Sequence, residues 1–120
     1  MRQYRQTSRT LFDALPHVKA EDLRPGDLLI HRGRAGFDEG GARPVLRVET
    51  VPDDREWVRI FQPITPGRFF PDGESAIRAQ AAQLVTIAPP YWPANGETRT
   101  ITEQDVRAAH QARASAEAEQ

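Results

Sequence analysis

The chain has 120 residues, a formal net charge of −1 and no cysteine, and its length suits a single domain with its own core. The lack of cysteine excludes a disulfide framework, a thiolate metal site and a cysteine nucleophile. The near-neutral charge gives no whole-chain bias toward nucleic acid, although residues 1–36 hold seven Lys/Arg against four Asp/Glu. Apolar runs fall short of the roughly 18 residues of a membrane helix, so we expect a cytoplasmic protein with no membrane partner.

Short apolar runs separated by turn residues predict a mainly β fold. Strands are expected over about residues 17–20, 27–32, 44–51, 55–62, 75–80 and 84–88. Pro25-Gly26 suits a type II turn, because proline fixes φ and glycine tolerates a positive φ. The glycine-rich segment 33–41 and the proline-rich segment 63–74 are expected to be loops. Residues 81–83 are expected to form a helical turn before the last strand.

The hairpin of residues 44–51 and 55–62 has the clearest strand pattern. Its second strand carries apolar groups on both faces, with Val58 and Ile60 on one and Trp57 and Phe61 on the other. Such a strand is usually covered on both sides. We therefore expect the Trp57/Phe61 face to be covered by the C-terminal segment or by an apolar cluster in the N-terminal arm: Leu11, Phe12 and Leu15.

A proline-rich linker and a helix are expected to end the chain. Thr102 suits the N-cap, and Asp105 stands where a capping box wants an acidic or amide side chain. Frequent alanine and the Glu103–Arg107 pair favour a helix. Its apolar stripe is thin, so this helix could be frayed or detached from the domain: Val106, Ala109, Ala112 and Ala116.

Together these elements predict a small antiparallel β-barrel of five to six strands with a C-terminal α-helix. The expected segments are an N-terminal arm (1–17), a β-barrel domain (18–88), a Pro-rich linker (89–101) and the helix (102–118). The arrangement over about 18–88 resembles the SH3-like barrels. The Leu23-Arg24-Pro25-Gly26-Asp27 turn also resembles a turn of Hint-type self-splicing domains. That family uses a cysteine or serine nucleophile and histidine motifs, which this chain does not match, so the resemblance ends at the turn.

Catalytic and metal-binding patterns are missing from the sequence. His17, His31 and His110 stand far apart, without the spacing of metal ligands. The glycine-rich segment does not read G-x-G-x-x-G and is expected to lead into a strand, so it lacks the helix N-terminus that binds phosphate. No serine lies in a G-x-S-x-G context. We expect a non-enzymatic protein with no metal and no cofactor.

Two segments offer aromatic side chains for binding. Arg68 adjoins Phe69 and Phe70, whose rings point opposite ways in an extended chain, so one could anchor in the core while the other binds a peptide or a base. Alternatively, both rings close the end of the barrel. Tyr91 and Trp92 lie within a minimal P-x-x-P spacing. Alternatively, they fold back over the sheet, onto Trp57.

The leading hypothesis is a binding or adaptor module for a protein or an extended peptide. Its candidate binding residues are Arg68, Phe69, Phe70, Trp57, Arg59, Tyr91 and Trp92. One alternative is a nucleic-acid-binding barrel, which the acidic segment 37–75 opposes. Its phosphate contacts would come from Arg32, Arg34, Arg47, Arg59 and Arg68. Another alternative is an accessory domain or subunit of an enzyme. A homodimer through the helix stripe or an open barrel edge is compatible with all three.

Overall fold

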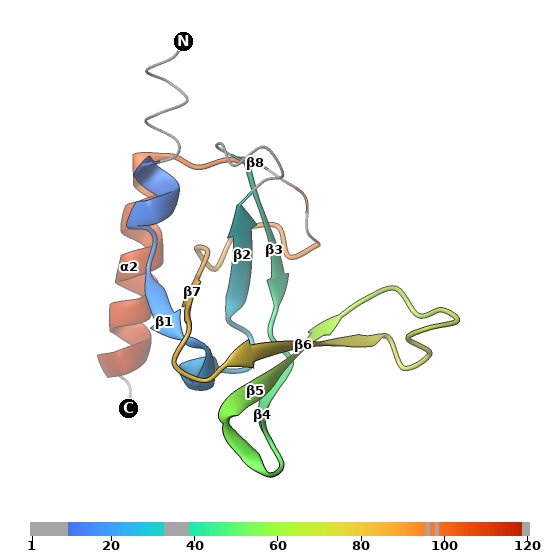
Figure 1. Ribbon diagram of the computed structural model, residues 1–120. Coiled ribbons are helices and arrows are strands. Elements are labelled where there is room, and N and C mark those ends of the chain that lie inside the picture. The colour runs from blue at the N-terminus through green and yellow to red at the C-terminus, as the bar shows by residue number, and fades with distance from the viewer. Residues whose placement is uncertain (1–9, 33–38, 96, 98, 119–120) are drawn as a thin grey trace.

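The computed structural model describes residues 10–32, 39–95, 97 and 99–118. Residues 10–14 are helical, and the elements that follow are β1 (His17–Lys19), the 3-10 turn η1 (Ala20–Asp22), β2 (Leu28–Arg32), β3 (Glu39–Pro44), β4 (Arg47–Val51), β5 (Asp54–Pro63), β6 (Glu74–Gln80), β7 (Leu84–Thr86), β8 (Arg99–Thr100) and α2 (Glu103–Ala118). The fold is mainly β with a C-terminal helix, as the sequence predicts. Figure 1 shows α2 on one side of the strands, and the helical residues 10–14 contact it through Ala14 O and His110 Nε2.

The described strands pair antiparallel in three sheets: β1–β7, β2–β3–β8 and β4–β5–β6. A single bridge between Leu29 and Ile87 links the β1–β7 sheet to β2. Val45 and Leu46 carry the chain from β3 into β4. The sheets do not close on one another, so a closed SH3-like barrel is not confirmed. Within the described part of the chain β6 pairs only with β5 and leaves its other edge open.

The expected turn after η1 is confirmed by its backbone geometry. Gly26 has a φ of +92°, which glycine adopts without the steric cost that a Cβ would bring. Its N–H donates to Val45 O at 2.8 Å, and Val45 N–H donates to Asp27 O at 2.8 Å. The Asp27 carboxylate also accepts Arg24 N–H at 2.8 Å. These bonds fix the start of β2 against the point where β3 leads into β4.

Two local predictions are corrected. Residues 39–41 were expected in a loop, but they belong to β3, in which Gly41 lies opposite His31 and Ala42 is fully buried. Pairing with β2 outweighs the low intrinsic strand preference of glycine. Residues 33–38 lie outside the described part. Residues 81–83 form a turn closed by Gln83 N–H and Gln80 O at 3.0 Å, not a helical turn.

The core consists of two clusters, and they decide which face of β5 is buried. Val58 and Ile60 belong to a cluster shared by the sheets, with Ala20, Leu23, Leu29, Val45, Ala79, Ala81 and Ile87. The other cluster joins α2 to the strands: Phe12, Leu15, Leu28, Ile30, Ala42, Ala88, Trp92, Ile101 and Ala109. The arm residues Phe12 and Leu15 therefore pack against α2 and β2. The prediction that the arm or the C-terminal segment covers Trp57 and Phe61 is wrong. The arm and the C-terminal segment pack in this second cluster, which includes neither Trp57 nor Phe61.

The C-terminal helix is docked rather than detached. Thr102 Oγ1 accepts Asp105 N–H at 3.3 Å while Asp105 Oδ2 accepts Thr102 N–H at 2.9 Å, which confirms the predicted capping box. Ala109 is buried, and His110 Nε2 lies 2.6 Å from Ala14 O. The mostly buried Arg113 pairs with Asp27 at 3.2 Å. Small side chains allow close approach, so a thin apolar stripe suffices for docking.

Candidate functional site

The loop between β5 and β6, residues 64–73, carries the most exposed aromatic side chain in the described chain. Phe69 is 83% exposed and Phe70 is 42% exposed, and Arg68 beside them is also exposed. Figure 1 shows this loop projecting away from the other strands. Of the two sequence-based alternatives, closure of the fold by both rings is therefore not what the structure shows.

Backbone hydrogen bonds give this loop a defined shape. Ile64 N–H donates to Gly73 O at 2.9 Å and closes the base. Phe70 O accepts two bonds, from Gly67 N–H at 3.3 Å and from Gly73 N–H at 3.0 Å. Gly73 has a φ of +72°, and a Cβ there would lie 3.2 Å from Pro66 Cγ, so this position needs glycine. These backbone bonds thus hold the loop in the shape that exposes its aromatic tip.

A second group of candidate residues lies on the outer face of the β4–β5–β6 sheet. The register places Arg47 opposite Phe61, and Arg59 opposite both Glu49 and Arg78. Side chains alternate across a strand, so these positions share one face with Trp57. We call this the Arg/aromatic face: Arg47, Glu49, Trp57, Arg59, Phe61, Glu74 and Arg78. The expected grouping of Arg47 and Arg59 with Trp57 and Phe61 is confirmed.

Arginine side chains cover the two rings of this face. The Arg47 guanidinium lies 3.9 Å from the Phe61 centroid, and that of Arg78 lies 4.9 Å from the Trp57 centroid. Both distances are within the range of cation–π attraction. The long side chains thereby shield the rings, as arginine stems often do on apolar surfaces. Arg78 was not among the sequence-predicted site residues, since its place beside Trp57 depends on the β5–β6 register.

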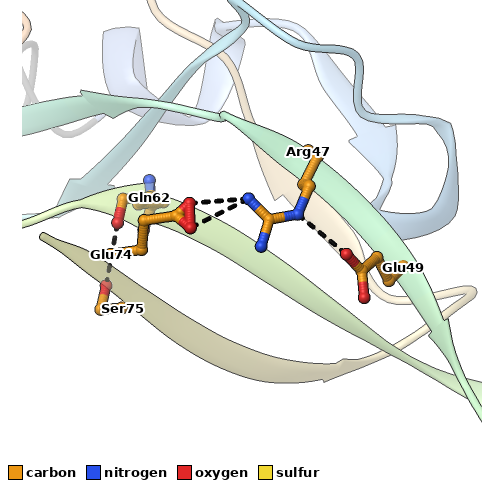
Figure 2. Close-up of polar contacts among 5 residues, drawn as sticks. All are labelled: Arg47, Glu49, Gln62, Glu74 and Ser75. Atoms are coloured by element: carbon orange, nitrogen blue, oxygen red, sulfur yellow. Dashed lines mark hydrogen bonds and ion pairs between the residues drawn. The ribbon is translucent and has the colours of Figure 1, made fainter. Parts of the chain in front are cut away.

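Carboxylates hold Arg47 in place. Figure 2 shows its guanidinium between Glu74, at 2.7 Å, and Glu49, at 2.8 Å. The hydrogen bonds to Glu74 first, and then to Glu49, raise the pKa of Arg47. The hydrogen bond from Arg47 lowers the pKa of the Glu74 carboxyl. Arg59, by contrast, forms no ion pair or hydrogen bond with another described side chain.

Tyr91 and Trp92 lie elsewhere, next to α2. Trp92 is 3% exposed within the α2 cluster, and the Arg99 guanidinium lies 4.9 Å from its ring centroid. It does fold back into the domain, but not onto Trp57. The Tyr91 hydroxyl donates to Asp105 at the start of α2. Tyr91 is 52% exposed, and partial desolvation of its hydroxyl, followed by this hydrogen bond, raises its pKa to about 12. The structure thus separates this pair from the other candidate residues.

The described residues include no group of three or more His, Asp or Glu side chains that could hold a metal ion. None of the helices in that part of the chain is long and apolar enough to cross a bilayer. Comparison with known protein families, curated proteins and solved structures found no match to the chain. Arguments about function therefore rest on the loop tip and the Arg/aromatic face themselves.

Proposed function

We propose that the chain is a non-enzymatic binding module that docks on another protein through the aromatic tip of loop 64–73. The partner would receive Phe69 and Phe70 in an apolar pocket, with Arg68 at the rim. In this proposal the strands are an opened form of an SH3-like barrel, and the loop is its docking arm. An enzyme that recruits this chain as an accessory subunit would be one such partner.

The exposure of Phe69 carries the proposal. A phenylalanine side chain gains about 2–3 kcal/mol when it moves from water into an apolar pocket. An exposed ring on a projecting loop does not gain this free energy in the isolated chain. The ring would gain it on entering an apolar pocket of a partner. The loop is already closed by its backbone bonds, which lowers the ordering cost of association. Arginine and aromatic residues are also the side chains most enriched among interface anchors.

The test is a capture experiment with matched loop variants. Wild-type chain, the double variant Phe69→Ala/Phe70→Ala and the control Thr65→Ala are immobilised, and Thr65 is an exposed polar residue of the same loop. We expect a partner that the wild type and Thr65→Ala retain and the double variant loses. Thermal unfolding of all three should agree within a few degrees. Retention of the partner by all three proteins would mean that the two rings do not bind it. Loss of folding in the double variant would mean that the rings support the fold.

The Arg/aromatic face supports nucleic-acid binding as a second candidate function. The Arg47 and Arg78 guanidinium groups lie over two aromatic rings, and Arg59 shares the same sheet face, a combination that suits phosphate contact and base stacking. Two features place it second. Glu49 and Glu74 already neutralise Arg47, and the guanidinium groups of Arg47 and Arg78 cover the rings.

A salt titration distinguishes this second candidate. Binding of a single-stranded oligonucleotide through Arg59 and Arg78 would weaken steeply as salt rises, because counterions are released from the phosphates. The variant Arg59→Ala should then reduce the salt slope, whereas Phe69→Ala should leave it unchanged. An affinity that does not change with salt concentration, or no binding at low salt, would contradict nucleic-acid binding through this face.

A further inference from the structure

We infer that the open edge of β6 binds an extended peptide strand in which apolar residues alternate with acidic ones. This surface does not include the tip of loop 64–73, so the inference stands apart from the proposed docking function. It rests on three properties of the edge: its outward backbone groups, a groove with a mainly apolar lining on one side of it, and two facing arginines on the other.

The first property follows from the register of β5 and β6. Ile64 N–H bonds Gly73 O at 2.9 Å, and Ala81 N–H bonds Glu56 O at 2.7 Å, at the two ends of this pairing. Hydrogen-bonded pairs alternate with non-bonded pairs in an antiparallel ladder. The odd-numbered residues of β6 therefore bond to β5. The even-numbered residues direct their backbone groups away from β5: Glu74, Ala76, Arg78 and Gln80. The C=O of Gln80 already accepts Gln83 N–H at 3.0 Å, so the edge offered to an added strand runs from Glu74 to Arg78.

The second property is a groove of about 380 Å³ between β6 and β7. Buried side chains of Leu29, Ile30 and Ile60 contribute to its lining. Ile77 on β6 and Leu84 on β7 also line it, and they are 39% and 64% exposed. A strand laid along β6 would place every second side chain in this groove, because side chains alternate between faces. Most residues that line the groove are apolar, although Arg78, Gln83 and Thr86 also line it. Apolar side chains therefore fit the part of the groove between Ile77 and Leu84.

The third property is a repulsive pair on the Arg/aromatic face. Arg59 and Arg78 stand directly opposite each other on β5 and β6, and like charges in that position destabilise a sheet. Arg78 has only a distant carboxylate, Asp54 at 3.9 Å, and Arg59 pairs with no described carboxylate. An acidic side chain opposite Arg78 on an added strand would relieve this repulsion. Glu74, near the other end of the edge, is already paired with Arg47. The positive charge of Arg59 and Arg78 therefore favours an acidic over a basic residue opposite Arg78.

These properties together describe β-strand addition, in which backbone bonds give affinity and alternate side chains give selectivity. The probe is a fluorescein-labelled octapeptide that alternates valine with glutamate, and its counterpart alternates valine with lysine. Anisotropy with the full chain should show saturable binding of the glutamate peptide. Binding of the lysine peptide should be at least about tenfold weaker, as expected for a cross-strand charge pair that changes from attraction to repulsion.

Three variants test the three properties. Ala76→Pro removes an outward N–H without removing a bond to β5, and should weaken binding about tenfold. Leu84→Glu places a carboxylate at the groove and should weaken binding even if Ala76→Pro perturbs the strand. Arg78→Glu should reverse the preference toward the lysine peptide. The double variant Phe69→Ala/Phe70→Ala should bind the glutamate peptide like the wild type.

Three results would overturn the inference. One is the absence of saturable binding to the glutamate peptide. Another is binding that neither Ala76→Pro nor Leu84→Glu weakens. The third is sedimentation behaviour of a dimer that Ala76→Pro converts to a monomer, since the edge would then serve a second copy of the chain.

Discussion

Phe12→Ala and Phe69→Ala delete the same ring from positions with opposite burial. Phe12 is 6% exposed in the α2 cluster, whereas Phe69 is 83% exposed at the loop tip. With about 180 Å² per phenylalanine side chain and about 25 cal/mol per Å², the buried area stabilises the fold by about 4 kcal/mol at Phe12 and by less than about 1 kcal/mol at Phe69. Measured losses for buried Phe→Ala changes, about 3–5 kcal/mol, agree with the first figure.

Urea unfolding followed by tryptophan fluorescence measures both changes, because Trp92 lies in the α2 cluster and Trp57 on the β4–β5–β6 sheet. In thermal unfolding the difference corresponds to about 3–5 °C per kcal/mol for a domain of this size. A loss above about 2 kcal/mol for Phe69→Ala would mean that the ring supports the fold. A loss below about 1 kcal/mol for Phe12→Ala would contradict the packing described for the arm and α2.

Three further measurements test the local chemistry. In a Tyr4→Phe variant Tyr91 is the sole tyrosine, and its ultraviolet absorbance should titrate with a pKa of about 12. Because that value lies above the ordinary pKa of about 10, the stability that neutral Tyr91 contributes is complete below pH ~10 and is lost as pH rises toward 12; a midpoint near 10 would contradict its contact with α2. Thr102→Ala removes the N-cap and should cost about 1 kcal/mol, whereas the exposed Ser115→Ala should change stability by under about 0.5 kcal/mol; equal losses would mean the cap is not formed. Arg47 lowers the pKa of Glu74, so the stability from this pair is present above the ordinary carboxyl pKa and is lost as pH falls below it. Glu74→Gln should therefore be less stable than the wild type near neutral pH and equal to it in acid, and a difference that persists in acid would refute the pair.

Local signals were sufficient to predict several elements from the sequence. The β4–β5 hairpin follows from alternation of side chains and a short polar turn, and the start of α2 follows from Thr102 and Asp105. These features depend on residues within a few positions of one another. The strand at residues 39–44 was missed in part, because its glycines are held by pairing with β2 rather than by their own preference.

Contacts between residues far apart in the chain determine two features that local sequence patterns do not predict. Both faces of β5 carry apolar residues, and the core cluster around Val58 and Ile60 fixes which face is buried. The expected linker 89–101 contains the buried Trp92 and Ile101 and the short strand β8, so packing against α2 gives it a structural role that its proline content conceals.

The candidate sites were predicted by residue type but not by arrangement. Arg68, Phe69 and Phe70 could be identified because aromatic residues beside an arginine are common binding anchors. Their exposure depends on a loop shape held by backbone bonds that the sequence does not specify. The sequence does not identify Arg78 as a site residue, because only the strand register places it beside Trp57 and opposite Arg59.

The most direct test of the docking proposal is the dissociation constant of a purified partner, one that the wild-type chain captures and the Phe69→Ala/Phe70→Ala variant loses. Calorimetry should show affinity at least about 30-fold weaker for the double variant, since burial of one ring is worth about 2 kcal/mol or more. The unfolding temperature should stay within a few degrees of the wild-type value, and Thr65→Ala should bind as the wild type does. Equal affinity of the wild type and the double variant would contradict docking through the loop tip.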